Sequence, residues 1–552
     1  MGVRPFSAFF LLSCLLAGAS STPLSPLPLH LLRHKNGSGG HPARGLSCRS
    51  WRLAVETNNL LEWEGVPPEC KDYVGNYMLG HLYREDSQMV VNQAIQYAED
   101  GVTLGADGKD IWIFDIDETS LSNIPFYAEY GFGSEPPNAT AFEVWAEKAK
   151  APALPETLRL YNSLLVLGIK PVFLTGRTEE SRAATIVNLK EAGYDNWEKL
   201  LLRGPDSKES AMAFKAGERR KLVEEGGYRI VGNIGDQWSD ILGYPEGDRT
   251  FKLPDPICFA SPRAIAIRRE GGLKCGKRGA PPVSVGRPMR GLSSPPSWLA
   301  PFLLLLSLLA PAARSQTFLE LFPRGRVADG DGDGLFCESW KFSVEANDAG
   351  VWLTIPSRCL GYVREYMTGP RYGADCSVVA GDAFDFAQTV ATLRDGEDGK
   401  NAWIFDVDET LLSNLPYYEV NGFGSGLFNE TSFDEWVDEA IAPAIPASLK
   451  FYQQLQQLGF KLVLLTGRSE HQRNATEKNL LFAGYRDWEM LILRGPSDQG
   501  KTAVLYKSEK RAWLVSLGYK IYGSSGDQWS DLEGAPIAER SFKLPNPLYY
   551  IK

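Results

Sequence analysis

Two carboxylates in one short motif are the first residues of this sequence that could do chemistry. The motif D-I-D-E-T, residues 115–119, follows an apolar run at 111–114. Asp115 and Asp117 can share one site if the chain bends there, and close carboxylates move each other's pKa values apart. One can then stay ionised while the other carries a proton, which suits a nucleophile beside a general acid. The alternative is an acidic turn in solvent, which a single D-x-D motif would favour.

The motif occurs twice, and its repetition favours a functional site over an acidic turn. D-V-D-E-T at 406–410 lies 291 residues after the first, so that Asp406 and Asp408 repeat the pair. The motifs L-T-G-R, L-R-G-P and G-D-Q-W-S-D recur with the same offset. A repeat of this length is far longer than the repeats of solenoid proteins. We therefore expect two whole domains, at 45–257 and 334–552.

Four further residues of each copy could act with these carboxylates. The hydroxyl of Thr175 and adjacent backbone N–H groups could hold phosphate oxygens, and Lys215 could neutralise a nucleophile and a phosphate. Asp236 and Asp240 offer hard oxygen ligands, which suit Mg²⁺. The counterparts in the second copy are Thr466, Lys507, Asp527 and Asp531.

The assignments of the threonine and the lysine each have an alternative without a catalytic role. Taken alone, Thr175 could be a turn residue and Lys215 an exposed residue of a helix. Lys208 and Lys501 also compete with Lys215 and Lys507, because the two copies differ by one residue in length at this point.

Short apolar runs alternate with patterns of helical period along each copy. The alternation predicts an α/β fold with a parallel sheet. Strands are expected at 111–114, 170–174, 200–202 and 229–234 and at 402–405, 461–465, 491–493 and 520–522, with helices such as 156–167 and 179–192 between them. The motif residues then fall just after strand ends, where open α/β sheets bind ligands. The first hundred or so residues of each copy are expected to be mostly helical and to pack outside the sheet.

Composition and charge exclude several classes of protein. The chain is 43% hydrophobic and 23% charged, which is typical of globular proteins. Its net charge of −10 argues against broad binding of nucleic acid. None of the five histidines recurs at an equivalent position, since His81 faces Pro370 and His471 faces Glu180. A histidine mechanism shared by both copies is therefore excluded.

Two segments have the character of export signals. Residues 1–20 combine Arg4 with an apolar run and a small-residue cleavage site. A second apolar segment, 298–315, is short for a membrane span and follows a basic stretch that we assign as a linker at 258–297. Entry into the secretory pathway, with no stable membrane span in the mature protein, is therefore expected. The mid-chain signal leaves open whether one chain or two joined secreted proteins are present.

In that compartment N-x-S/T motifs become candidate glycosylation sites. They occur at Asn36, Asn138, Asn429 and Asn474.

Taken together, the motifs resemble those of the haloacid-dehalogenase-like phosphohydrolases. The closer resemblance is to the plant acid phosphatases and vegetative storage proteins of the class B type. It rests on C-x-S-W, WIFD-DET, LTGR, LR-GP, GDQWSD and the closing F-K-L-P in both copies, and it covers about four-fifths of the chain. The resemblance implies a Rossmann-like parallel sheet with small cap elements, an aspartyl-phosphate intermediate and Mg²⁺.

The resemblance also implies a role for each motif residue of the first copy. Asp115 would be the nucleophile, and Asp117 would protonate the leaving group and then activate water. Thr175 and Lys215 would bind the phosphoryl group. Asp236 would hold Mg²⁺ with Asp115 and the backbone carbonyl of Asp117, and the supporting residue would be Asp240. The same roles in the second copy would fall to Asp406, Asp408, Thr466, Lys507, Asp527 and Asp531. Disulfides are expected between Cys48 and Cys70 and between Cys337 and Cys359.

The function expected is hydrolysis of phosphate monoesters by an Mg²⁺-dependent acid phosphatase in each of two tandem domains. The second Asp favours this reaction, because an alkoxide leaving group needs a proton whereas a halide does not. The alternative is a vegetative storage glycoprotein whose accumulation matters more than its turnover. The expected partners are small phosphomonoesters and not nucleic acid, the expected location is extracellular or vacuolar, and a homo- or hetero-dimer is left open.

Overall fold

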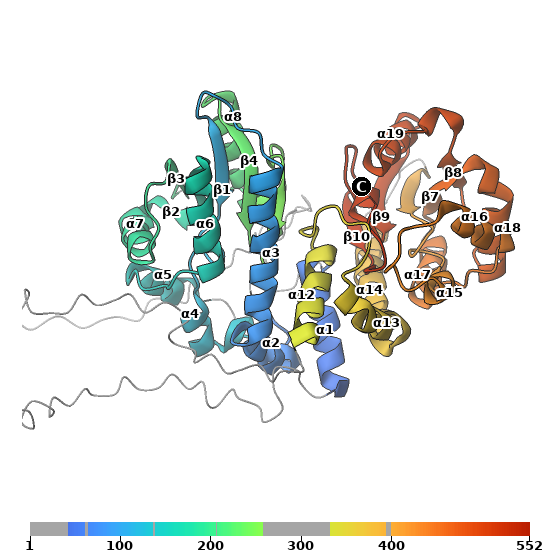
Figure 1. The fold of residues 1–552 in the computed structure, drawn as a ribbon, viewed down its shortest axis with the longest axis horizontal. Helices are drawn as coiled ribbons and strands as arrows, with labels where there is room; N and C mark the ends of the chain where they lie inside the picture. Colours follow the sequence, from blue (N-terminus) through green and yellow to red (C-terminus); the bar gives the residue numbers. More distant parts are fainter. Residues whose placement is uncertain are drawn as a thin grey trace, which may run out of the picture.

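The computed structural model describes residues 42–60, 65–135, 138–205, 207–257, 332–392 and 399–551. They form two α/β units of the same architecture, with a group of helices between the two sheets (Figure 1). The signal at 1–20, the linker at 258–297, the apolar segment at 298–315 and Asn36 lie outside the described residues. Among the described residues, no helix has the length and apolar character that crossing a membrane requires.

The first unit contains a parallel sheet of five strands in the order β3-β2-β1-β4-β5. Every residue of the central strand β1 is buried. Its strands are β1 (Asp110–Phe114), β2 (Lys170–Thr178), β3 (Lys199–Arg203), β4 (Arg229–Gly235) and β5 (Thr250–Lys252). The predicted α/β class and the four predicted strands are confirmed.

The second unit repeats this sheet in the order β10-β9-β6-β7-β8. Its strands are β6 (Asn401–Phe405), β7 (Lys461–Ser469), β8 (Met490–Arg494), β9 (Lys520–Gly526) and β10 (Arg540–Lys543). The tandem duplication that the motifs predict is therefore a duplication of the whole fold.

Helices of three kinds surround each sheet. Those that connect the strands are α6 (Pro155–Leu167), α7 (Arg182–Glu191) and α8 (Ala211–Glu224), repeated as α17 (Pro446–Gln457), α18 (Arg473–Ala483) and α19 (Ala503–Ser516). Small cap helices follow the central strand: α4 (Ile124–Glu129) and α5 (Ala139–Glu147), repeated as α15 (Leu415–Val420) and α16 (Glu430–Glu439). The predicted helical segment is α1 (Pro42–Glu56), α2 (Lys71–Met78) and α3 (His81–Asp100), repeated as α12 (Gly332–Glu345), α13 (Leu360–Thr368) and α14 (Pro370–Thr392). The expected domain starts, 45 and 334, fall inside α1 and α12.

The helical segments of the two units pack on each other. Helix α12 lies against α3 of the first unit, and α1 lies against α14 of the second (Figure 1). Phe342 of α12 belongs to the buried core of the first unit, and Met89 of α3 to that of the second. Disulfides join Cys48 to Cys70 and Cys337 to Cys359, so that each first helix is tied to its own unit.

Two details of the sheets differ from the sequence prediction. Strand β2 does not end before Thr175 but continues to Thr178, because the chain shifts register after Leu174 and pairs again with β3 at Arg203. Thr175 therefore lies within a strand, as Thr466 does in β7. The fifth strand of each sheet, which holds the Phe and Lys of the closing F-K-L-P motif, was not predicted, because β5 has only three residues and β10 only four.

A glycine lets the central tryptophan of each sheet pack flat. Trp403 stacks on Phe542 with ring centroids 5.5 Å apart. A Cβ atom on Gly523 of β9 would approach the Trp403 ring to 2.4 Å. The first unit repeats this contact between Gly232 and Trp112. Glycine is therefore needed for room at these positions.

We predict that Gly523→Ala lowers the free energy of unfolding by about 1–3 kcal/mol, because the methyl group overpacks a buried ring. Chemical denaturation measures the change. Gly361→Ala in α13 is the control, since its added Cβ would meet no atom within 4 Å and alanine favours a helix. Equal stability of the two variants would show that the contact with Trp403 is not a constraint.

Candidate active site

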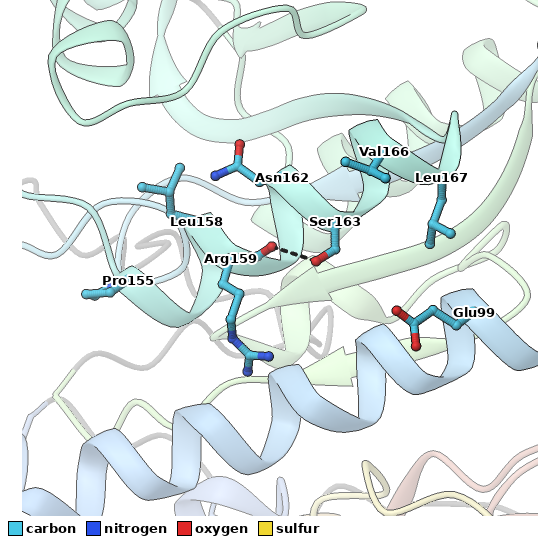
Figure 2. A pocket seen from close by; sticks show the side chains of 8 residues that line it. All are labelled: Glu99, Pro155, Leu158, Arg159, Asn162, Ser163, Val166 and Leu167. Atoms are coloured by element: carbon cyan, nitrogen blue, oxygen red, sulfur yellow. Dashed lines mark hydrogen bonds between the residues drawn. The ribbon is translucent and has the colours of Figure 1, made fainter.

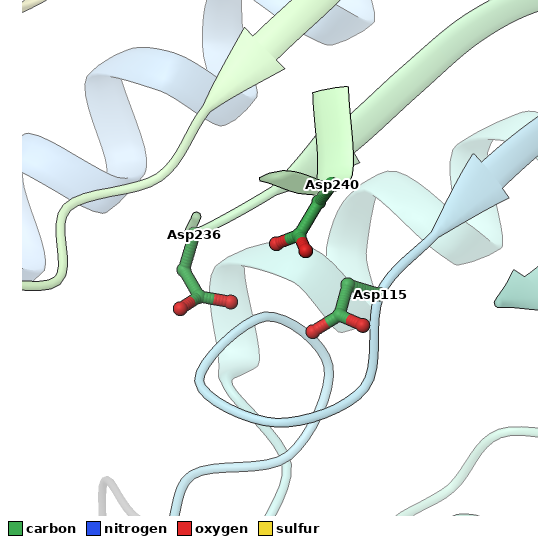
Figure 3. A group of neighbouring side chains, drawn as sticks. All are labelled: Asp115, Asp236 and Asp240. Atoms are coloured by element: carbon green, nitrogen blue, oxygen red, sulfur yellow. The ribbon is translucent and has the colours of Figure 1, made fainter. Parts of the chain in front are cut away.

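Three buried carboxylates of the first unit converge at the carboxyl edge of the sheet. Asp115 follows β1, Asp236 follows β4, and Asp240 lies in the short helix α9 (Trp238–Ile241) (Figure 3). Carboxylate oxygens of the three residues lie within 4.8 Å of one another. The second unit repeats the group with Asp406 after β6, Asp527 after β9 and Asp531 in α20 (Trp529–Leu532). Because β1 and β4 are adjacent parallel strands, the sheet order itself brings these acids together.

A buried lysine bridges two of the three acids. Lys215 of α8 donates from Nζ to Asp115 and, at 2.6 Å, to Oδ1 of Asp240. Burial disfavours its charged form, but the two carboxylates outweigh this effect and raise the pKa of Lys215 above its usual value. Burial also raises the pKa of Asp115 well above its usual range, although Lys215 opposes this effect. Lys215 therefore supplies the positive charge that the buried acids require.

The structure distinguishes the competing lysines. Lys507 makes the same two contacts in the second unit, to Asp406 and Asp531. Lys501 instead pairs with Asp498 and Glu509, and Lys208 is exposed. Lys215 of α8 and Lys507 of α19 thus contact the acids, although the two copies differ by one residue in length before these helices.

The second carboxylate of the motif lies on a bend and is held by an arginine. Glu118 has a positive φ of 57°, which turns the chain directly after Asp117. Arg177 donates to Asp117 from Nη2 at 2.6 Å and from Nε at 3.0 Å. Although burial would raise the pKa of Asp117, Arg177 holds it below its usual value. Asp408 and Arg468 repeat this pair, and the pKa of Asp408 is lowered in the same way.

This ionisation pattern differs from the one suggested by the motif alone. Spacing suggested an ionised first carboxylate and a protonated second one. In the structure the arginine pair stabilises the ionised form of Asp117, while burial favours the neutral form of Asp115. The role of Asp117 as a proton donor remains a prediction, and it requires the pair with Arg177 to loosen.

Sequence reasoning assigned no role to Thr119, Asn123 and Arg177, which orient the site. Asn123 donates from Nδ2 to Asp117 at 2.9 Å and accepts from the indole N–H of Trp145, also at 2.9 Å. Thr119 donates to Asp236 at 2.8 Å. The second copy repeats these contacts with Asn414, Trp436 and Thr410. The signal was present, because Thr119, Asn123 and Arg177 all belong to the repeated motifs.

The predicted phosphate-binding threonines lie on the strand next to the central one. Thr175 is fully buried on β2, and its hydroxyl accepts a hydrogen bond from the backbone N–H of Arg177 at 3.1 Å. Thr466 is placed in the same way with Arg468. Each threonine is thus linked to the arginine that holds the second carboxylate.

The two sites differ in one buried side chain, which is a carboxyl group in the first unit and an amide in the second. Asp255 of the first unit accepts from the Gln237 amide at 2.9 Å, and the same amide donates to Asp236 at 3.1 Å. Asn546 occupies the corresponding position in the second unit and donates to Asp527 at 2.7 Å. Burial and the carboxylates of Asp240 and Asp255 raise the pKa of Asp236 well above its usual range. In the second unit, burial and Asp531 raise the pKa of Asp527 only to about 6.

The acid clusters have the chemistry of a site for a divalent cation. Each offers carboxylate oxygens from two separate loops within a buried region. Hard oxygen ligands of this kind suit Mg²⁺ and similar cations. The buried acids outnumber the single lysine in each cluster, and a cation would offset this excess negative charge.

Other features lie away from these acids. A hollow of about 570 Å³ lies beside α6 and Glu99 of α3 and is lined by residues such as Leu158, Arg159 and Val166 (Figure 2). None of the predicted site residues lines it. The side chains of Asn138, Asn429 and Asn474 are exposed; the first two cap α5 and α16. Their glycosylation remains a prediction.

We predict that Lys215→Met lowers the free energy of unfolding at pH 7.5 by about 3–5 kcal/mol, because two buried carboxylates lose their cation. The loss should be smaller at pH 5, because burial raises the pKa of Asp115 and its protonation there removes one of the unpaired charges. Thermal and chemical unfolding measure both effects. Lys208→Met is the control and should stay within about 0.5 kcal/mol of the parent. Similar losses for both variants would contradict the assignment of Lys215.

Comparisons with known proteins agree with this geometry. The sequence profile of the HAD superfamily, subfamily IIIB (acid phosphatase), matches residues 35–260 and again 327–552. Acid phosphatase 1 of Solanum lycopersicum is 53% identical over 219 residues, which cover 40% of this chain and 85% of that protein. A stem 28 kDa glycoprotein of Glycine max is 48% identical over 231 residues, covering 41% and 89%. Vegetative storage protein 1 of Arabidopsis thaliana is 39% identical over 270 residues, covering 47% and 99%.

Among solved structures, the class C acid phosphatase from Bacillus anthracis with tungstate bound is similar, with 27% identity and a TM-score of 0.29. The match covers 35% of this chain and 84% of that one. The family profile, by contrast, covers most of this chain and matches each unit separately. The chain therefore belongs to the acid phosphatase subfamily IIIB of the HAD superfamily, of which it carries two copies in tandem.

Proposed function

We propose that each copy is an Mg²⁺-dependent acid phosphatase that hydrolyses phosphate monoesters through an aspartyl-phosphate intermediate. The observation that carries the proposal is the lysine-bridged acid cluster, which is present in both copies with the same contacts. The repeated match of the family profile supports the same reading of both copies.

In the first half of the reaction, the ionised form of Asp115, which Lys215 stabilises, attacks phosphorus, and the bond between phosphorus and the ester oxygen breaks. Asp117 gives its proton to the departing alkoxide. Thr175 and Lys215 hold the phosphoryl oxygens and balance their charge. A Mg²⁺ ion held by Asp115, Asp236 and the backbone carbonyl of Asp117 would stabilise negative charge on the phosphoryl group.

In the second half, Asp117 takes a proton from water, which attacks the phosphoryl group and releases Asp115. Arg177 favours the ionised form of Asp117 that this step needs. The first step needs the protonated form, and its population rises as the pH falls toward the lowered pKa of Asp117. Acidic conditions therefore favour proton donation, in accord with an acid phosphatase.

We also propose the organisation and location of the chain. Residues 45–257 and 334–552 are the catalytic domains, 1–20 is an export signal, and 258–297 and 298–315 are a linker and a second signal-like segment. The disulfides and the exposed Asn138, Asn429 and Asn474 suit the secretory route, with an extracellular or vacuolar destination.

A storage role is the second candidate, because relatives include proteins named vegetative storage proteins. Both copies keep the acid cluster, which favours catalysis. Abundance of the protein in tissue under high and low nitrogen supply separates the two roles. Accumulation that follows nitrogen supply would favour storage, and constant abundance would favour the enzyme.

We predict that Asp115→Asn and Asp406→Asn each remove the activity of one copy toward p-nitrophenyl phosphate, because each loses one nucleophile. The double variant should lose at least about 1000-fold in kcat/KM. Asp100→Asn, at an exposed position of α3, is the control. Full activity of the double variant would rule out these nucleophiles.

Chelation by EDTA should abolish activity, and added Mg²⁺ should restore it. We expect the first copy to recover at lower Mg²⁺ concentrations than the second. Burial raises the pKa of Asp255, but a bound cation favours its ionised form, whereas Asn546 of the second copy cannot ionise. Mg²⁺ titrations of the two single nucleophile variants separate the copies. Undiminished activity after chelation would contradict the metal requirement.

A further inference from the structure

The acid-bearing loops of the two copies meet at the contact between the units. Trp238 lies between Asp236 and Asp240 in the G-D-Q-W-S-D motif, and Trp529 lies at the same place in the second copy. The two indole rings stack on each other with centroids 5.2 Å apart and an angle of 28° between their planes. Each ring thus links the metal-binding motif of its own copy to that of the other.

Each tryptophan is also anchored within its own copy. The indole N–H of Trp238 donates to the backbone carbonyl of Glu56 at 3.1 Å, at the end of α1. Trp529 donates to the carbonyl of Glu345 at 2.9 Å, at the end of α12. The stacked rings are therefore held at one edge by hydrogen bonds and on one face by the other copy.

A second pair of contacts repeats with the same symmetry. Asp348 of the second copy accepts from the backbone N–H of Lys252 at 2.7 Å, and Asn59 of the first accepts from that of Lys543 at 2.7 Å. Asn59 also donates to the carbonyl of Lys543 at 2.8 Å. Lys252 and Lys543, whose N–H groups donate these bonds, lie in the last strand of each sheet, shortly before Asp255 and Asn546.

These contacts are isologous, which means that one surface patch meets its own counterpart. Arg249 donates to the carbonyl of Asp348 at 2.9 Å, and Arg540 donates to that of Asn58 at 2.8 Å. The packing of α12 on α3 matches that of α1 on α14. A repeated set of contacts of this kind is the arrangement of a symmetric dimer, here within one chain.

We infer that the two copies form an internally symmetric pair in which each copy positions the metal-binding loop of the other. Trp529 is then a positioning residue for Asp236 and Asp240, and Trp238 for Asp527 and Asp531. The inference rests on the proposed phosphatase function of each copy. The physical reason is that Trp238 is the first residue of the short helix α9, which also carries Asp240, so that the stack with Trp529 restrains the backbone between the two acids. Misplacement by about 1 Å can cost up to about 100-fold in rate.

The test measures the activity and Mg²⁺ binding of the first copy after a substitution in the second. Asp406→Asn leaves only the first copy active and serves as the reference. Adding Trp529→Ala should lower kcat/KM of the first copy about tenfold and weaken its Mg²⁺ binding, measured by calorimetry, by a similar factor. Trp529→Phe should restore most of both, because a ring still covers Trp238. Trp513→Ala, at an exposed position of α19 in the second copy, is the matched control.

Unchanged kcat/KM and Mg²⁺ affinity in the Trp529→Ala variant would overturn the inference. If that variant fails to fold, Asp348→Ala provides the same comparison through the Lys252 contact, with the same two outcomes. If the reference itself has no activity, the proposed function of the first copy is wrong. Calorimetry with Mg²⁺ alone then still decides whether Trp529 acts on the first site.

Discussion

A carboxylate that is buried without a cation costs several kcal/mol, and this constraint governs the centre of each unit. Asp115 and Asp240 both pair with the ammonium group of Lys215, and Asp117 pairs with the guanidinium group of Arg177. The order of the strands must therefore bring β1, β2 and β4 together, and α8 must pass over them with its lysine pointing inward. The second unit meets the same constraint with the same residue types.

The second constraint acts between the units. Their helical segments share buried core residues, and their last strands and tryptophan loops exchange hydrogen bonds and ring contacts. This contact includes the tryptophan that lies between two of the acids in each G-D-Q-W-S-D motif. The duplication thus joins the two sites through one shared contact, and the difference between Asp255 and Asn546 gives one site a carboxyl group where the other has an amide.

The apolar runs of the sequence predicted the strands, and the repeated motifs predicted which acids lie together at the strand ends. Both signals are strong because buried strands are apolar and the acids follow them directly. It did not predict the arginine pair of Asp117, since spacing alone does not show where a side chain points at a bend. Only the structure separated the competing lysines, because it shows that Lys215 of α8 and Lys507 of α19 reach the acids. Strand β5 is too short for a pattern, and the role of Trp238 depends on a residue 291 positions away in the other copy.

The central claim is that each copy uses the aspartate at the end of its central strand as a nucleophile. The most direct measurement is acid quenching of the full-length protein during turnover of a ³²P-labelled phosphomonoester, followed by peptide mass spectrometry. We expect one labelled phosphoryl group on Asp115 and one on Asp406. Absence of label from both, or label on other residues, would contradict it.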